Sequence, residues 1–204
     1  MSMDCHCHTG ASPDGRGDPA ALLGGGQVGC RTLVAVTDHN SVAAVPEALA
    51  AARTSGVQVV PGVEVSCAAP FEPSREIHLL AWFVGHPAGR AWQSAAVHRL
   101  LDAARGAHER LFGIIASRLG LDARIQQDLL AACRADGMAS GNYGAPCLFD
   151  RAAQVSGQWT PMAARARREA DRCRKHGPWP RFPSVERAAA TFQQAGAIWA
   201  LAHP

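Results

Sequence analysis

The sequence predicts an α/β domain with a mostly parallel sheet and a mainly helical insertion. Short apolar runs alternate with helix-like segments over residues 1–85 and again over 184–204, whereas residues 86–183 have mainly helical character. Strands separated by helices favour parallel pairing through crossover connections. The chain has 204 residues, of which 48% are hydrophobic, so it is long enough for one domain with a real core and a sizeable insertion.

Five apolar runs have the length and composition of buried strands. They cover residues 3–8, 31–37, 57–61, 77–84 and 198–202. A first helix is expected at Asp18-Pro19, because an N-cap side chain precedes a proline at the first helical position. Further helices are expected over the alanine-rich residues 41–55 and over 184–195.

One long helix is expected within the insertion. Its apolar residues recur at steps of three and four: Val97, Leu100, Leu101, Ala104, Leu111, Phe112 and Ile115. This spacing places them on one helix face. We therefore divide the chain into the first part of the main domain at 1–85, the insertion at 86–183 and the return to the main domain at 184–204.

Charge and cysteine content narrow the class of protein. The formal net charge of +3 does not by itself indicate a nucleic-acid binder, although residues 165–181 hold seven Arg or Lys against Glu169 and Asp171. Such a basic run is either a solvated face or suited to an anionic substrate. The seven cysteines have no disulfide-like spacing, and neither a signal peptide nor a membrane span is evident. We therefore expect a cytoplasmic protein with free thiols and no membrane partner.

The first predicted strand carries a candidate metal site. His6 and His8 are two residues apart, so both imidazoles lie on one face and can reach one ion. Cys5 and Cys7 then point to the opposite face as buried thiols that are not bridged. A structural zinc site that uses these two cysteines is an alternative, although no second pair at the usual spacing is present.

Other ligand-type residues lie near the ends of the predicted strands. His39 follows the second strand, Glu64 the third and His203 the fifth, whereas His78 lies near the start of the fourth. In α/β proteins with parallel strands, sites form at the carboxyl ends of the strands. The joint pattern therefore predicts that these side chains converge with His6 and His8.

Six motifs in this order resemble those of the PHP (polymerase and histidinol phosphatase) superfamily. They are Asp4-Cys5-His6-Cys7-His8-Thr9, Ser12-Pro13-Asp14-Gly15, Thr37-Asp38-His39, Gly62-Val63-Glu64-Val65-Ser66, Ile77-His78-Leu79-Leu80 and Leu201-Ala202-His203-Pro204. The most similar branch contains nucleoside 3′,5′-bisphosphate phosphatases and 5′-to-3′ exoribonucleases. The resemblance implies a distorted (β/α)7 barrel, incomplete over these 204 residues, with a helical insertion.

The resemblance also implies a set of metal ligands. His6 and His8 would hold one ion, Glu64 would bridge it to a second ion that His78 and His203 also hold, and Asp14 and His39 would hold a third. Two to three divalent ions are implied, as Mn, Fe or Zn with Mn favoured. Glu64, His203 and Asp38 would take part in catalysis. Asp38 would orient a ligand histidine, or else have a turn or helix-dipole role.

Two elements of the family pattern are not matched. The family's last motif, Asp-x-His, does not occur after Leu201-Ala202-His203-Pro204, and the best local match to an Arg-Pro-His-like substrate element is Ala145-Pro146-Cys147. The missing motif predicts weaker metal binding and weaker activity for this segment alone.

The function implied is metal-dependent hydrolysis of a phosphomonoester or a terminal phosphodiester. The substrate expected is a small phosphorylated molecule, a nucleotide or short RNA, and stable binding of duplex nucleic acid is not expected. The alternatives are a histidinol-phosphate-type phosphatase and an inactive, metal-binding PHP fragment.

Overall fold

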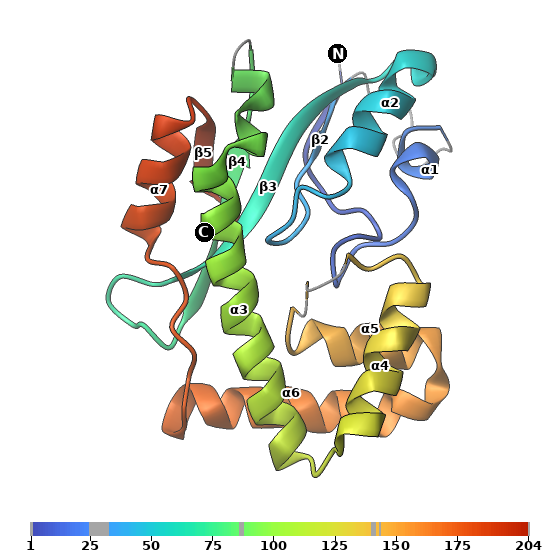
Figure 1. The fold of residues 1–204 in the computed structure, drawn as a ribbon, viewed down its shortest axis with the longest axis vertical. Helices are drawn as coiled ribbons and strands as arrows, with labels where there is room; N and C mark the ends of the chain where they lie inside the picture. The colour runs from blue at the N-terminus through green and yellow to red at the C-terminus, as the bar shows by residue number, and fades with distance from the viewer. Residues whose placement is uncertain (1, 25–32, 86–87, 140–141, 143, 204) are drawn as a thin grey trace.

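The computed structural model describes residues 2–24, 33–85, 88–139, 142 and 144–203. Its centre is a curled sheet of five strands in the order β1-β2-β3-β4-β5, with helices packed on one face and a helical group at one end (Figure 1). The strands are β1 (Met3–Cys7), β2 (Leu33–Val36), β3 (Gln58–Ala68), β4 (Glu76–Trp82) and β5 (Ile198–Leu201). The mixed α/β class is therefore confirmed.

The predicted parallel pairing is correct for half of the sheet and wrong for the other half. Strands β1, β2 and β3 are parallel, whereas β4 is antiparallel to both β3 and β5. A parallel crossover needs a dozen or more residues, and only residues 69–75 separate β3 from β4. The strand expected at 57–61 also continues to Ala68, since Val63, Val65 and Cys67 extend its buried face.

Strand β3 changes its partner at Gly62. Residues 58–61 pair with β2, and residues 62–68 pair with β4. A Cβ atom at Gly62 would lie 2.7 Å from Thr37 Cγ2 and 3.0 Å from the carbonyl oxygens of Val36 and Ala81. Glycine is therefore required where the end of β2 and the strand β4 both approach this backbone.

The sheet is strongly curled. Trp82 Nε1 on β4 donates a hydrogen bond of 2.7 Å to the carbonyl oxygen of Cys5 on β1, although two strands lie between β1 and β4 in the sheet. The native twist of strands produces such curling when one face is covered by helices. The curl brings residues of β1 close to those of β4 and β5.

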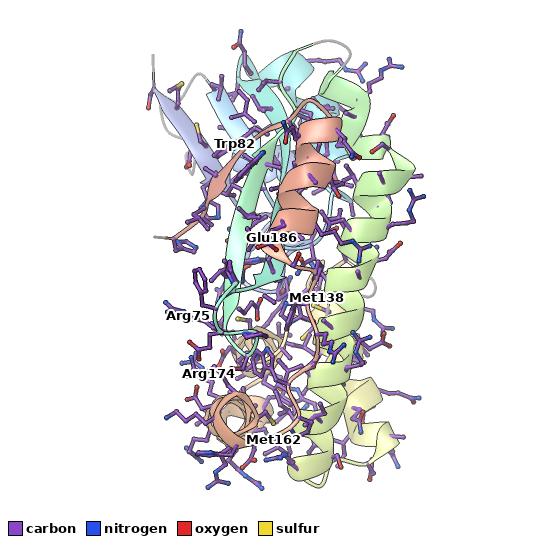
Figure 2. The ribbon with its side chains drawn as sticks, turned by 90° about the vertical axis from the view of Figure 1, so that its left-hand side faces the viewer. Arg75, Trp82, Met138, Met162, Arg174 and Glu186 are labelled. Atoms are coloured by element: carbon purple, nitrogen blue, oxygen red, sulfur yellow. The ribbon has the colours of Figure 1, made fainter. Side chains whose placement is uncertain are left out.

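Helices cover the convex face of the sheet. Val63 and Val65 on β3 pack in one buried cluster with the first half of α3 (Ala95–Arg118) and with α7 (Val185–Gln194). Figure 2 shows both helices on the same side of the sheet. Because side chains alternate along a strand, Glu64 and Ser66 point to the other face. That alternation supplies polar groups to the concave side.

Two short helices follow the first two strands as expected. In α1 (Pro19–Gly24), the Ala21 backbone N–H donates to Asp18 Oδ1, which is the predicted cap. Helix α2 (Val45–Ser55) begins later than the predicted residue 41. In α7, the Ser184 side chain is the N-cap and accepts a hydrogen bond from the Arg187 backbone N–H.

The second strand was expected at residues 31–37. Residues 31 and 32 lie outside the described residues, and β2 covers Leu33–Val36.

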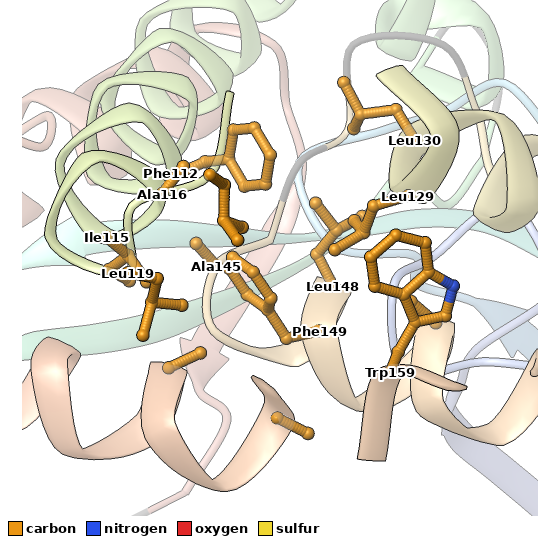
Figure 3. Packing of buried hydrophobic residues seen from close by; sticks show 14 of the residues in the cluster. Phe112, Ile115, Ala116, Leu119, Leu129, Leu130, Ala145, Leu148, Phe149 and Trp159 are labelled. Carbon is orange, nitrogen blue, oxygen red and sulfur yellow. The ribbon is translucent and has the colours of Figure 1, made fainter. Parts of the chain in front are cut away.

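The segment between β4 and α7 is mainly helical. It contains a 3₁₀ turn η1 (Ala88–Gln93), α3, α4 (Ala123–Ala135), α5 (Cys147–Val155), a 3₁₀ turn η2 (Gly157–Trp159) and α6 (Thr160–His176). Its own core joins the second half of α3 to the other helices, and Phe112 and Phe149 lie at its centre with ring centroids 5.5 Å apart (Figure 3). Because α3 packs in both cores, it connects this helical group firmly to the sheet.

The two thiols of β1 differ in exposure. Cys7 is buried against Leu22, Leu23 and Val34, as expected, but Cys5 is exposed, so the prediction that both are buried is wrong. The cover that α1 provides to this edge strand does not extend to Cys5. No disulfide joins these two described cysteines.

Among the described residues, no helix has both the length and the apolar composition needed to cross a membrane.

Candidate metal centre

The strand directions bring the predicted ligands to one edge of the sheet. His6 lies on β1, His8 follows it, and His39 follows β2. Since β4 runs antiparallel to β3, its first residues, including His78, lie at the same edge as the ends of the parallel strands. Strand β5 reverses direction again, so His203 after its end also returns to this edge.

The buried carboxylate of Glu64 lies at the centre of these side chains. It is 0% exposed and lies within β3, not at the strand end that the sequence predicts, because β3 is longer than expected. Its two oxygens lie close to five imidazole nitrogens. The distances to Oε2 are 2.7 Å from His6 Nε2, 3.1 Å from His8 Nε2 and 3.6 Å from His39 Nε2, and those to Oε1 are 2.9 Å from His78 Nδ1 and 3.6 Å from His203 Nε2.

Asp14 joins the same cluster from the loop after β1. Its Oδ2 lies 3.1 Å from His39 Nε2, and its Oδ1 lies 3.7 Å from His8 Nδ1. Ser12 fixes this arrangement, since its Oγ donates to Asp14 Oδ1 at 2.7 Å and accepts from the His39 backbone N–H at 3.1 Å. The structure thus brings together all seven residues proposed as ligands.

The donor set fits divalent metal ions. Three groups each have their ligand atoms within 4.8 Å of one another: His6, His8 and Glu64; His8, Asp14 and His39; and His39, Glu64 and His78. A central ion with bonds of about 2.0–2.3 Å can be reached from such positions. Glu64 Oε1 is buried and accepts no hydrogen bond from the described residues, because the nearby His78 Nδ1 lies outside hydrogen-bond geometry. A buried, charged carboxylate oxygen that accepts no hydrogen bond requires a cation nearby to offset the loss of hydration.

Both carboxylates of the cluster remain ionised. Burial alone would raise the pKa of Glu64, but contacts with His78, His8 and His39 hold this pKa well below its usual range. Burial would likewise raise the pKa of Asp14, and the contact with His39 lowers it instead. Ionised oxygens are the form that binds a metal ion.

The family is decided by a match over most of the chain. Residues 4–177 match the model of the PHP domain. This chain belongs to the PHP domain family. The model covers β1 to β4, the helical segment up to Gly177 and six of the seven proposed ligands, so the resemblance of the sequence motifs is confirmed.

Two solved structures have the same fold as this PHP domain. A candidate metal-dependent phosphoesterase from Bifidobacterium adolescentis matches with a TM-score of 0.75 and 23% identity, over 100% of this chain and 67% of that one. An amidohydrolase from Chromobacterium violaceum, solved with bound sulfate and no metal, matches with a TM-score of 0.62 and 21% identity over the same shares. A comparison with the curated proteins found no match.

Two residues that the sequence analysis missed support His78 from outside the cluster. Glu76 Oε1 lies 2.9 Å from His78 Nε2 and 3.2 Å from His108 Nε2 on α3. Burial would raise the pKa of Glu76, but His108 and His78 hold it well below its usual range. A carboxylate on the second nitrogen of a ligand histidine fixes its ring orientation. The spacing Glu76-x-His78 on one strand could have revealed the first partner; nothing near His108 in the sequence could have revealed the second.

The structure gives Asp38 a different set of contacts from those expected for a partner of a ligand histidine. It is buried, and its carboxylate accepts from the Thr9 backbone N–H at 2.6 Å and from Thr9 Oγ1 at 2.8 Å. Asp38 therefore fixes the turn directly after His8, which supports the alternative turn role. Burial raises its pKa despite both hydrogen bonds.

The helical segment holds the ligand loop at residues 10–14 in place. The buried Arg151 guanidinium on α5 donates to the carbonyl oxygens of Gly10, at 2.9 Å, and of Ser12. Asn142 Nδ2 donates to the carbonyl oxygens of His39, at 2.7 Å, and of Ala11, at 3.3 Å. Two polar side chains of this segment thus position the backbone that carries Asp14 and His39.

A pocket of about 270 Å³ opens beside the cluster. His39 and His78 form part of its wall together with Glu76, His108 and residues 144–147. The segment Ala145-Pro146-Cys147, the local match to the family's substrate element, therefore does reach the site. None of the described residues that line this pocket is Arg or Lys.

The metal-free domain is expected to lose stability as the pH rises. Burial lowers the pKa of His78, but Glu64 and Glu76 raise it to about 10, above the value of 6.5 in an unfolded chain. The charged imidazole therefore stabilises the fold fully below pH 6.5, and this contribution is lost as the pH rises towards 10. Thermal unfolding in EDTA should thus give a Tm that falls over this range.

The stabilisation of the domain by bound metal is expected to increase as the pH rises. An ion at His78 must displace its proton, so the gain in Tm on adding Mn²⁺ should increase with pH. Scanning fluorimetry at matched pH values with Mn²⁺ or EDTA measures this gain. A gain that stays constant with pH would contradict the assignment of His78 as a ligand.

Proposed function

We propose that this PHP domain hydrolyses phosphate esters with two to three divalent ions, preferably Mn²⁺, held by the seven clustered residues. The observation that carries the proposal is the buried Glu64 carboxylate surrounded by five imidazoles. Bound ions would hold phosphate oxygens and lower the pKa of a water molecule that attacks phosphorus. In the family to which the domain belongs, the same motifs imply phosphatase chemistry.

The clustered residues and their neighbours would have different roles in metal binding and hydrolysis. Glu64, whose oxygens face different histidines, is placed to bridge two ions, with His6 and His8 on one side and His78 and His203 on the other. Asp14 and His39 would hold a third ion. Glu76 keeps the His78 ring oriented, and Arg151 and Asn142 keep the ligand loop in place. His203 is 70% exposed and is thereby accessible to a substrate at the rim.

We propose a phosphomonoester or a terminal phosphodiester of a nucleotide or short oligonucleotide as the substrate. The resemblance of the six sequence motifs to the branch that contains nucleoside 3′,5′-bisphosphate phosphatases and 5′-to-3′ exoribonucleases supports this proposal. The pocket beside His39 and His78 would receive the part of the substrate next to the phosphate, and its lack of described Arg or Lys suits an uncharged group such as a ribose.

Metal analysis and a substrate panel test the proposal. The purified chain is assayed with Mn²⁺, Zn²⁺ or Fe²⁺ on p-nitrophenyl phosphate, mononucleotides, nucleoside bisphosphates, dinucleotides and histidinol phosphate. We expect hydrolysis that EDTA abolishes and Mn²⁺ restores. Turnover of histidinol phosphate alone would support the alternative phosphatase, and metal binding without turnover of any substrate would support an inactive metal-binding domain.

A further inference from the structure

A second hollow adjoins the pocket beside the metal cluster. It has a volume of about 380 Å³, and Arg75, Arg167, Arg174 and Trp179 line it. Glu76 and Pro146 line both this hollow and the pocket that contains His39 and His78, so the two cavities share a wall. We call it the arginine hollow. Figure 2 shows Arg75 and Arg174, from the turn before β4 and the end of α6, on the same side of the molecule.

The arginine hollow has positive charge that is accessible to a ligand. Arg75 is exposed and has no carboxylate partner among the described residues. Arg167 and Arg174 pair with Asp150 and Asp171, each at 2.9 Å, and both arginines are exposed. The exposed Arg174–Asp171 pair is weak, so the Arg174 guanidinium can exchange this carboxylate for a phosphate, which it binds in a bidentate manner. Arg167 is held more firmly, because it makes three contacts of 2.9–3.0 Å to the partly buried Asp150.

The remaining wall residues fit a nucleotide chain. The wall also contains two carboxylates: Glu76, which lies against His78 and His108, and Asp171, which pairs with Arg174. Trp179 offers a half-buried aromatic ring, and bases of single-stranded nucleic acid stack on such rings. A phosphate at the metals, an uncharged sugar in the adjoining pocket and a second phosphate at the arginines would follow the order of groups along an oligonucleotide.

We propose that the arginine hollow binds the phosphate next to the scissile one, and that the substrate class is a short single-stranded oligonucleotide. This inference rests on the proposed phosphoesterase function. It also assigns a role to part of the basic run at residues 165–181. A nucleoside bisphosphate carries the same second phosphate, and the experiment below separates the two sources.

The first arm measures binding without metal, so that it does not depend on activity. A fluorescent pentanucleotide is titrated in EDTA against the wild type, an Arg75→Ala/Arg174→Ala variant and an Arg53→Ala/Arg172→Ala control. The control removes the same charge, and Arg172 on α6 has an ion pair with Glu169 like that of Arg174 with Asp171. We expect a rise in Kd of about tenfold and a salt dependence reduced by about one unit in the first variant, with the control within about twofold of the wild type.

The second arm measures KM with Mn²⁺. The Arg75→Ala/Arg174→Ala variant should have a raised KM for a 5′-phosphorylated dinucleotide, which has two phosphates, and an unchanged KM for p-nitrophenyl phosphate, which has no second phosphate. A KM raised for a nucleoside bisphosphate but not for the dinucleotide would contradict the oligonucleotide class.

The outcomes separate the two proposals. Oligonucleotide binding that is absent in the wild type, or equal in the two variants, would overturn the role of the arginine hollow. If no phosphate ester is hydrolysed but the first variant still loses binding, the proposed function fails and the anion site stands. Matching Tm values of the variants would exclude unfolding as the cause, and Arg75→Lys, tested if the double variant unfolds, should retain part of the binding.

Discussion

Replacing Glu64 with glutamine is expected to abolish turnover while the fold is retained. Glu64 contributes to two of the three ligand groups, so the amide would weaken the binding of at least two ions at once. Loss of charge stabilisation of about 4 kcal/mol in the transition state corresponds to a fall in kcat/KM of about a thousandfold. The amide has nearly the same volume, so packing around β3 should change little.

Metal content and steady-state kinetics measure this effect together. Glu186→Gln on α7 is the matched control, because it removes the same charge from an exposed carboxylate away from the cluster. The control should keep both metal and activity. Retention of metal and turnover by Glu64→Gln would remove Glu64 from the site.

Replacing Arg151 with methionine is expected to destabilise the domain and the site together. The buried guanidinium donates to the carbonyl oxygens of Gly10, Ser12 and Asp136 and to the Asp136 carboxylate. Methionine would leave these acceptors without a donor. Because Asp136 is partly exposed and can be resolvated, we expect the free energy of unfolding to fall by about 2–4 kcal/mol.

The same substitution should weaken metal binding at Asp14 more than at His78. The loop that Arg151 holds carries Asp14, whereas His78 lies on a paired strand. Denaturant unfolding and metal titration, with Arg172→Met as the control for an exposed arginine in an ion pair, measure both effects. Equal behaviour of the two variants would show that the helical segment does not position the ligands.

The alternation of residues along strands explains how much of the centre could be predicted from sequence. His6 on β1 and His8 directly after it share a face because they are two residues apart. Val63 and Val65 pack on the helices, while Glu64 points the other way. The helix cap at Asp18 and the helix that begins after Ser184 could likewise be predicted, since they depend on neighbouring residues.

Local patterns could not predict which distant residues meet. The antiparallel direction of β4 placed His78 in the cluster, and the long helix α3 brought His108 to Glu76. The contact of Arg151 with the ligand loop gave no signal in the sequence, because its acceptors there are backbone carbonyl oxygens about 140 positions earlier.

The sequence by itself therefore determined the positions of the strands, the residues of the candidate metal cluster and the family of this domain. Each of these depends on short motifs, and the directions of their side chains follow from local backbone geometry. Only the tertiary structure decided the sheet directions, the outer partners Glu76 and His108 and the support of the ligand loop by Arg151. These depend on how separate elements pack, because burial and hydrogen bonding between distant segments select one arrangement among many with the same local patterns.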